Sequence, residues 1–237
     1  MSDTAPLLDV AVDAARLAGA LLTHRMRDGA ERNVSSKSTP TDLVSEADLA
    51  AERAIRELLG RRRPDDGVVG EEGGSEGGTS GLSWVVDPLD GTVNYLFGIP
   101  QWSISVAVRD RERTLAGAVY DPNRGELFTA TSDGPARLAG ADGSITVLGS
   151  GRGAAAAHGT PGERDDPAKL AGAMIATGFA YDADVRAAQA RVLTRLIGRV
   201  RDIRRTGSAA LPKRRMSRTR GTARASTCAW AARTPAS

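Results

Sequence analysis

A short acidic motif behind an apolar run constrains this chain more than any other feature. Residues 84–95 read Trp-Val-Val-Asp-Pro-Leu-Asp-Gly-Thr-Val-Asn-Tyr. The apolar start predicts the end of a buried strand, and the proline stiffens the loop that we expect to carry Asp87 and Asp90. Gly91 and Thr92 follow, and such a turn can direct backbone N–H groups toward an anion at the start of a helix. Two hard anionic ligands beside a phosphate cradle suit Mg²⁺-assisted phosphoryl chemistry.

The composition is typical of a globular protein. With 237 residues, 41% of them hydrophobic and 26% charged, the chain can bury a core as one large domain or two small ones. No apolar run approaches the roughly 20 residues that span a bilayer, and residues 1–4 lack the basic start of a secretory signal. A single cysteine, Cys228, excludes an intramolecular disulfide. We therefore expect a cytoplasmic protein without a membrane partner.

The net charge of +3 comes from the C-terminal tail. Residues 212–237 contain seven of the 32 basic residues and no acidic residue. The rest of the chain carries 25 basic and 29 acidic side chains, a net charge of −4. Because no nucleic-acid-reading module accompanies the basic tail, specific nucleic-acid binding is not expected. The alternative is a weak, salt-sensitive interaction of the tail with a polyanion or a membrane surface.

The hydrophobic pattern predicts a mixed α/β protein. Apolar residues at helical spacing predict helices over about residues 5–28, 44–59 and 184–197, the second of them stopped by Gly60 and Pro64. Apolar runs predict strands over residues 67–70, 84–86, 104–108, 115–120, 126–131, 144–148, 173–178 and 200–203. We divide the chain into an N-terminal α+β metal-binding domain (1–149), a linker or surface loop (150–168), a partial C-terminal α/β domain (169–211) and an irregular basic tail (212–237).

Three carboxylates are expected just past the ends of predicted strands: Glu71, Asp87 and Asp90. A sheet can direct such side chains into one cleft. The Leu89 carbonyl would add a further oxygen ligand there, and the Thr92 hydroxyl would hold the attacking water. The residues around the motif therefore predict metal-assisted hydrolysis of a phosphate ester.

Other reactive residue types are poorly placed for catalysis. The two histidines are His24, on a predicted helix, and His158, in a predicted loop, so a histidine-based metal site is not expected. Residues 73–81 are rich in glycine but lack the Gly-Lys-Ser/Thr ending of a P-loop, and we interpret them as a mobile loop. Cys228 has no base motif nearby, which argues against a catalytic thiol.

Residues 84–95, with Gly-Glu-Glu at 70–72 upstream, resemble the signature of the inositol monophosphatase family. Residues 37–44, Asp48 and residues 204–210 also match the family, and the similarity covers roughly residues 5–211 in the right order. The resemblance implies a Mg²⁺-dependent, lithium-sensitive phosphomonoesterase. It also implies an α/β fold, a layered αβαβα sandwich of the inositol monophosphatase/fructose-1,6-bisphosphatase type whose C-terminal half is incomplete here. A homodimer is the usual assembly in that family.

The resemblance further assigns roles to individual residues. It implies that Glu71, Asp87 and the Leu89 carbonyl hold one Mg²⁺, and that Asp87 and Asp90 share a second. Thr92, with Asp48 behind it, would orient and deprotonate the attacking water. The catalytic residues would thus be Asp48, Thr92 and Glu71. The other implied roles are substrate binding by Asp90 and by the N–H groups of Gly91 and Thr92, contacts to the substrate ring by Ser208 and Ala209, a lysine near the metal at Lys37 and a supporting carboxylate at Glu72. Lys37 and Glu72 are equally compatible with solvated side chains.

The C-terminal end departs from the family pattern. Relatives continue with a helix and strands, and they present a Trp-Asp pair whose aspartate binds the second metal. Here Pro212 would break the helix, and Trp230 is followed by Ala231. The tail is rich in Arg, Ala, Thr and Ser, as G/C-rich codons give when read out of frame, so we hypothesise a frameshifted or truncated C-terminus. Loss of the aspartate should weaken the second metal and lower turnover.

The expected substrate is a small phosphate monoester, with myo-inositol monophosphate the first choice. Alternatives within the family are histidinol phosphate, fructose 1,6-bisphosphate and 3′-phosphoadenosine phosphates, because specificity rests largely on the C-terminal half. An alternative of another class is a catalytically impaired, truncated relative that binds metal or anions without turnover.

Overall fold

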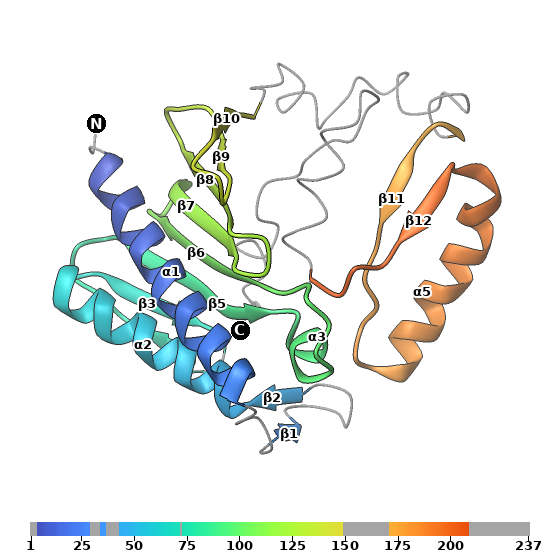
Figure 1. Ribbon diagram of the computed structural model, residues 1–237, viewed down its shortest axis with the longest axis horizontal. Helices are drawn as coiled ribbons and strands as arrows, with labels where there is room; N and C mark the ends of the chain where they lie inside the picture. Colours follow the sequence, from blue (N-terminus) through green and yellow to red (C-terminus); the bar gives the residue numbers. More distant parts are fainter. Residues whose placement is uncertain (1–3, 29–33, 37–42, 72, 149–170, 209–237) are drawn as a thin grey trace. The chain divides into compact units, whose positions relative to one another are not determined.

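The computed structural model describes residues 4–28, 34–36, 43–71, 73–148 and 171–208 (Figure 1). The described residues within 1–35 and 43–149 form one compact unit, and those within 36–42 and 150–237 form a second. The expected linker at 150–168 and tail at 212–237 lie outside the described residues, so the proposed domain boundaries stay a prediction. None of the described helices is long and apolar enough to cross a membrane.

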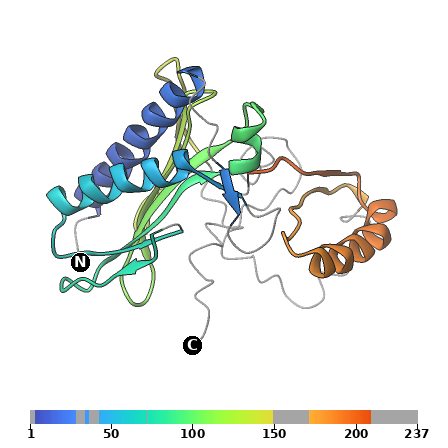
Figure 2. The same cartoon turned by 90° about the horizontal axis from the view of Figure 1, so that it is seen from below.

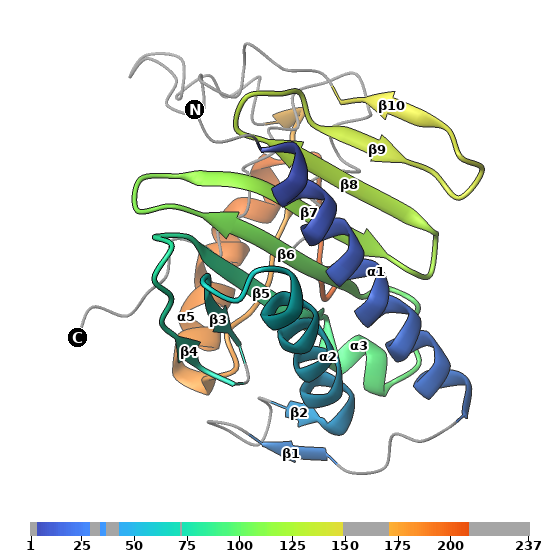
Figure 3. The same ribbon diagram turned by 90° about the vertical axis from the view of Figure 1, so that its left-hand side faces the viewer.

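An eight-stranded mixed sheet is the centre of the first unit (Figure 3). Its strands, in spatial order, are β10 (Ile145–Val147), β9 (Arg137–Ala139), β8 (Glu126–Thr131), β7 (Thr114–Asp121), β6 (Ser103–Arg109), β5 (Ser83–Asp90), β3 (Gly67–Gly70) and β4 (Ser75–Glu76). β3 and β5 pair in parallel, and the other neighbours pair antiparallel. A separate two-stranded sheet joins β1 (Val34–Ser36) and β2 (Leu43–Ser45). The predicted mixed α/β class is confirmed.

Two helices, α1 (Ala5–Asp28) and α2 (Glu46–Arg62), cover one face of this sheet (Figure 3). Their buried apolar residues recur at three- and four-residue spacing and include Leu7, Val10, Ala11, Ala14, Ala18 and Leu22 on α1 and Ala47, Ala51, Ile55 and Leu59 on α2. Alternate residues of the central strands complete the core, among them Trp84, Val86, Ile104, Val106 and Val108. This core fixes α2 against β5, the strand that contains the acidic motif.

Helix α2 and two short strands differ most from the prediction. α2 begins at Glu46, because residues 43–45 form β2, and it continues through Gly60 to Arg62. A Cβ added at Gly60 would meet nothing within 4 Å, so this glycine lies on an open helix surface and weakens the helix without ending it. Strand β9 was not predicted; it is too short to show alternation and is defined by its pairing with β8. The interpretation of residues 73–81 as a mobile loop is wrong in part, because Ser75 and Glu76 form β4 and pair with β3.

The acidic motif lies inside a strand and not, as predicted, on a loop that follows one. β5 continues through Asp90, and its pairing with β6 becomes irregular after Asp87. Asp87 lies opposite Ser105 and Asp90 opposite Ser103, so three steps along β5 correspond to two along β6. One extra residue in one strand is the property of a β-bulge, and a bulge tolerates the intervening proline, which cannot donate to the ladder.

The second unit is a βαβ arrangement. β11 (Met174–Ala176) and β12 (Asp202–Arg204) pair in parallel, and α5 (Ala183–Leu196) connects them and lies alongside both (Figures 1 and 2). The α5 N-terminus is capped because the N–H of Val185 donates to Asp182 Oδ1 over 2.9 Å. These elements confirm the helix and the two strands predicted between residues 173 and 203.

Gly19 decides how closely α1 approaches the sheet. A Cβ at this position would lie 2.6 Å from two ring atoms of Tyr120 and 3.3 Å from Pro122. We expect Gly19→Ala to lower the free energy of unfolding by about 1–3 kcal/mol, because the ring on β7 must move. Gly60→Ala, on the open side of α2, should raise it by about 0.5–1 kcal/mol. Chemical denaturation measures both changes, and two changes of the same sign would contradict this packing.

Candidate metal and phosphate site

Strand pairing gathers the predicted carboxylates at one end of the sheet. Gly70, the last residue of β3, pairs with Val86 in the parallel β3–β5 ladder. Glu71 and Asp87 directly follow this pair, so the ladder brings both residues to the same edge. Asp48 comes from the first turn of α2 and is only 1% exposed. Helix α2, strand β5 and the loop after β3 therefore supply the acidic side chains of the site.

Asp87 experiences the strongest electrostatic effect in this cluster. Burial raises the pKa of Asp87 well above its ordinary value, and repulsion from Asp90, Glu71 and Asp48 raises it further. The backbone N–H of Leu89 hydrogen-bonds the carboxylate and lowers the pKa by less than these effects raise it. The buried Oδ1 atom of Asp87 has no hydrogen-bond partner. A buried carboxylate among like charges gains most from a cation placed beside it.

The irregular pairing of β5 with β6 places the two aspartates of the motif on the same face of the sheet. Residues three apart on a regular strand point to opposite faces of the sheet. Here the β6 partners are Ser105 and Ser103, which are two apart and share a face, so the extra residue in β5 brings Asp87 and Asp90 into register. Ser103 is fully buried, and its hydroxyl donates to Asp90 Oδ2 over 3.4 Å. The bulge thus aligns the two carboxylates.

The Thr92 hydroxyl is held between Asp48 and the end of β5. Thr92 Oγ1 lies 3.0 Å from Asp48 Oδ1 and 3.1 Å from the Leu89 carbonyl oxygen. A hydroxyl has one hydrogen and two lone pairs, so donation to either oxygen leaves Thr92 able to accept a hydrogen bond from water. The tertiary structure thus brings Asp48 and Thr92 into the contact that the family resemblance requires.

Gly91 forms the turn into the short helix α3 (Thr92–Leu96). Its φ of 103° lies in the left-handed region that glycine adopts without strain. A Cβ there would lie 3.1 Å from the Gln101 carbonyl oxygen, which also accepts a 2.7 Å hydrogen bond from the Asn94 side chain. These contacts fix the first turn of α3 beside the carboxylates.

The oxygen donors of the site fit a hard divalent cation. The carboxylates of Glu71, Asp87 and Asp90 and the Leu89 carbonyl are the ligand type that Mg²⁺ prefers. A cation would partner the free Oδ1 of Asp87 and relieve the repulsion that raises its pKa. In the described part of the chain, no three His, Cys, Asp or Glu side chains form a ready-made cage, so binding must draw the carboxylates closer together. The Leu89 carbonyl has a second lone pair besides the one that faces Thr92.

Most of the predicted site residues belong to the first unit and surround the end of β5. These are Asp48, Glu71, Asp87, Leu89, Asp90, Gly91 and Thr92. Ser208 belongs to the second unit, where it is buried and its carbonyl oxygen accepts a 3.3 Å hydrogen bond from the Thr206 hydroxyl. Lys37, Glu72 and Ala209 lie outside the described residues. The catalytic and binding roles of all these residues stay predictions.

Sequence reasoning missed two buried residues and one half-buried residue around the site. Glu52 and Arg56 of α2 contact the loop after β3, and Ser103 contacts Asp90. The available signal for Glu52 was its spacing, because residues four apart lie on one face of a helix and Asp48 precedes it by four. Nothing comparable in the sequence indicated Ser103.

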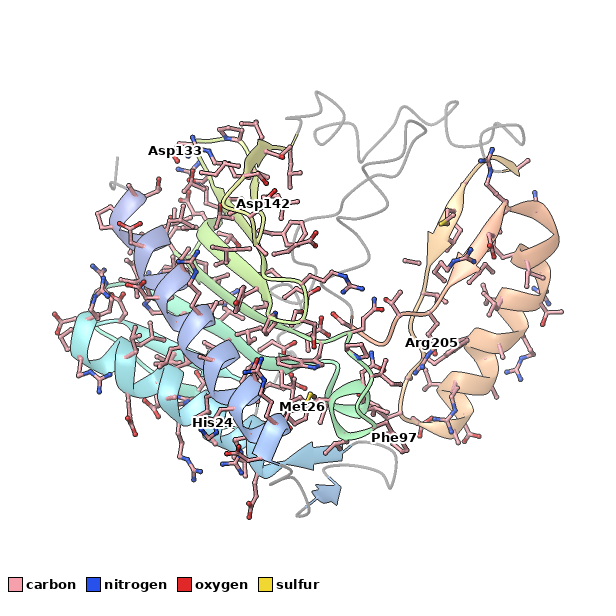
Figure 4. All side chains as sticks on the ribbon, in the orientation of Figure 1. His24, Met26, Phe97, Asp133, Asp142 and Arg205 are labelled. Carbon is pink, nitrogen blue, oxygen red and sulfur yellow. The ribbon has the colours of Figure 1, made fainter. Side chains whose placement is uncertain are left out.

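A pocket of about 400 Å³ lies elsewhere in the first unit, between α1 and the turn after β7. Its lining includes His24, labelled in Figure 4, whose Nδ1 lies 2.7 Å from Asp28 Oδ2. Asp28 is the one carboxylate among the described lining residues. The pocket therefore lacks the set of oxygen ligands found at the end of β5, and we assign the candidate site to β5.

The sequence of this chain matches one protein family and several curated proteins. A model described as the inositol monophosphatase family matches residues 3–216. The chain is 37% identical over 210 residues to "Nus factor SuhB" of Haemophilus influenzae, a match that covers 87% of this chain and 70% of that protein. It is 40% identical over 183 residues to the inositol-1-monophosphatase of Mycobacterium leprae, covering 75% of this chain and 58% of that protein.

Solved structures with similar folds include the suhB protein of Bartonella henselae. That structure superposes with a TM-score of 0.72 at 30% identity and covers 89% of this chain and 74% of its own. An IMPase of Thermotoga maritima gives a TM-score of 0.67 at 29% identity, covering 87% of this chain and 70% of its own. The matches therefore cover between 58% and 74% of the length of these relatives.

Proposed function

The chain belongs to the inositol monophosphatase family, and from this premise we propose that it is a Mg²⁺-dependent phosphomonoesterase. One observation carries the proposal. Asp87, buried and with an unpartnered oxygen, lies among Asp90, Glu71 and Asp48 beside a hydroxyl held by Asp48. Such an arrangement is costly for stability alone, and a bound cation with a phosphate substrate would explain it.

The metal ligands in this proposal are Glu71, Asp87, Asp90 and the Leu89 carbonyl. Mg²⁺ held by these groups would act as a Lewis acid that offsets negative charge on the phosphoryl group as the ester bond breaks. The N–H groups of Gly91 and Thr92 would donate to phosphate oxygens at the first turn of α3. The protein's contribution is to hold these groups in place before substrate arrives.

Thr92 and Asp48 would accept the proton of the attacking water by relay. The water donates a hydrogen bond to Thr92 Oγ1, while the Thr92 hydroxyl donates to Asp48 Oδ1, 3.0 Å away. As the water oxygen bonds to phosphorus, its proton passes to Thr92 and the hydroxyl proton passes to Asp48. The ester P–O bond breaks at the same time, and the leaving alkoxide takes a proton from solvent water to become the alcohol. This relay is general base catalysis through a hydroxyl, and the burial of Asp48 keeps competing water away from the acceptor.

Inositol monophosphate is the substrate that we propose first. The Mycobacterium leprae relative, which is named an inositol-1-monophosphatase, supports this choice. Ser208 and Ala209 would contact the ring of the substrate. Histidinol phosphate, fructose 1,6-bisphosphate and 3′-phosphoadenosine phosphates are the competing substrates, and a homodimer is the proposed assembly.

Phosphate release from this panel of esters by the full chain tests the proposal. We expect Mg²⁺-dependent release from inositol 1-phosphate that lithium inhibits and that Asp87→Asn removes. Faster release from another ester would support the proposed phosphatase activity and replace inositol 1-phosphate as the proposed substrate. Mg²⁺ binding without release from any ester would favour the catalytically impaired relative, and absence of both would overturn the proposal.

Mg²⁺ affinity should depend on pH through Asp87. The metal binds the ionised carboxylate, so binding must displace the proton that the raised pKa retains. We therefore expect the Mg²⁺ affinity to fall as the pH is lowered through the raised pKa of Asp87, by about tenfold per pH unit below that pKa. The fall should begin at a higher pH than it would for a carboxylate of ordinary pKa. Isothermal titration calorimetry in buffers of different ionisation enthalpy measures the affinity and the released proton. A pH-independent affinity would contradict this role of Asp87.

A further inference from the structure

Glu71 lies in a tight loop between β3 and β4. The N–H of Gly70 donates to the carbonyl of Gly74 over 2.9 Å and closes the loop. The antiparallel pairs of Val69 with Ser75 and of Val68 with Glu76 continue from it. The path of this loop decides where the Glu71 carboxylate lies relative to Asp87.

Glu52 reaches this loop from α2. Its side chain is 3% exposed, and its Oε1 atom accepts a 2.8 Å hydrogen bond from the N–H of Gly73. The same oxygen accepts a 2.8 Å hydrogen bond from Arg56 Nε, one helical turn further along. The buried negative charge of Glu52 is thus paired and also holds the loop backbone.

Arg56 extends the contact to the far side of the loop. Its Nη2 atom donates to the Gly74 carbonyl over 2.7 Å, and its Nη1 atom lies 3.0 Å from Glu76 Oε1 on β4. The rigid, planar guanidinium joins these groups in one fixed arrangement, which a lysine ammonium cannot reproduce.

Two glycines allow this close approach. A Cβ at Gly70 or at Gly73 would collide with Glu52 Oε1. The backbone is therefore held by α2 immediately before Glu71 and again two residues after it. Glu71 therefore follows directly on one of these two close approaches.

We propose that Glu52 and Arg56 form a loop clamp that positions Glu71 for metal binding, an inference that rests on the proposed function. Asp48 and Glu52 are four residues apart on α2, so one helix holds Thr92 through the first and the Glu71 loop through the second. The loop clamp does not touch the metal or substrate and acts through Glu71. Partners that orient metal ligands in this way typically change metal affinity 10- to 100-fold when removed.

The test compares Arg56→Met with a matched control, Arg62→Met, in the full chain. Both arginines lie on α2. Arg62 is the last residue of the helix and forms an exposed 2.8 Å ion pair with Asp13 of α1. Two quantities are measured: the Mg²⁺ dissociation constant by calorimetry, and the hydrogen exchange of the Gly70 and Gly73 amides without metal. Glu52→Gln is the second variant, because its amide oxygen still accepts from Gly73 but the ion pair with Arg56 is lost.

We expect Arg56→Met to weaken Mg²⁺ binding by about tenfold and to speed exchange of both amides, with Arg62→Met like the parent. Glu52→Gln should give a Mg²⁺ affinity and amide exchange rates between those of Arg56→Met and Arg62→Met. Unchanged exchange, or faster exchange with parent-like affinity, would overturn the loop clamp while leaving the phosphatase intact. Failure of the parent chain itself to bind Mg²⁺ would instead overturn the proposed function, and the positioning role with it.

Discussion

Replacement of Asp87 with asparagine is expected to abolish Mg²⁺-dependent phosphate release while raising the melting temperature of the metal-free protein. Loss of the proposed metal ligand Asp87 should lower kcat by at least about 10³-fold. The same change removes a buried charge that three neighbouring carboxylates repel. We expect a gain of about 1–3 kcal/mol in unfolding free energy, which is several degrees in melting temperature for a chain of this size.

The stability gain should depend on pH in a defined direction. The pKa of Asp87 is higher in the folded chain than in the unfolded chain, so protonation of Asp87 favours folding. That contribution is fully present below the unfolded pKa, about 3.9, and is lost as the pH rises through the folded value. The difference between Asp87→Asn and the parent should therefore be small near pH 4 and grow toward neutral pH. Thermal melts in EDTA across this range measure it.

Asp121 offers a matched control for this experiment. It is only 1% exposed, and its carboxylate accepts hydrogen bonds from the backbone N–H of Asn123 and from the Arg124 guanidinium, the latter over 2.8 Å. Asp121→Asn should therefore destabilise the fold by about 1–3 kcal/mol and leave turnover by the folded fraction intact. If both substitutions destabilised the chain equally, like-charge repulsion at Asp87 would be the wrong explanation.

Replacement of Thr92 with valine should lower kcat by about 100-fold with little change in Mg²⁺ affinity. Valine keeps the branched shape but removes the hydroxyl that lies 3.0 Å from Asp48. General base catalysis typically contributes factors of 10²–10⁴. Steady-state kinetics with calorimetry of Mg²⁺ binding separate the two effects. A matching loss of metal affinity would make Thr92 a structural support of the metal site and not part of the proton relay.

The relay also predicts how Thr92 and Asp48 combine. If both residues act in one proton transfer, the kcat of the double variant Asp48→Asn with Thr92→Val should be no lower than that of the slower single variant. If the two residues acted independently, the fold losses in kcat of the two single variants would multiply. Thr23→Val serves as the control, because its hydroxyl donates over 2.8 Å to the Gly19 carbonyl within α1 and takes no part in the site. That variant should keep parental kinetics.

Local patterns in the sequence were sufficient for most helices and strands. The apolar stripe of α1 predicted its full extent, and the alternating residues of β6 to β8 predicted three neighbouring strands. Both signals work because burial of one face forces a repeat of 3.6 or 2 residues. The combination of Asp87 and Asp90 with Gly-Thr, a preceding apolar run and an upstream Gly-Glu-Glu also indicated where the candidate site lies, although the motif proved to be part of β5.

Only the tertiary structure decided how these carboxylates become a site. The bulge between Asp87 and Asp90 depends on pairing with β6, and the contact of Thr92 with Asp48 joins residues 44 positions apart. The loop clamp of Glu52 and Arg56 likewise requires α2 to pack beside the β3–β4 loop. Sequence periodicity reports which face of an element is buried, but not which distant element buries it. The chain by itself thus determined the elements and the ligand types, whereas long-range packing determined their alignment and the raised pKa of Asp87.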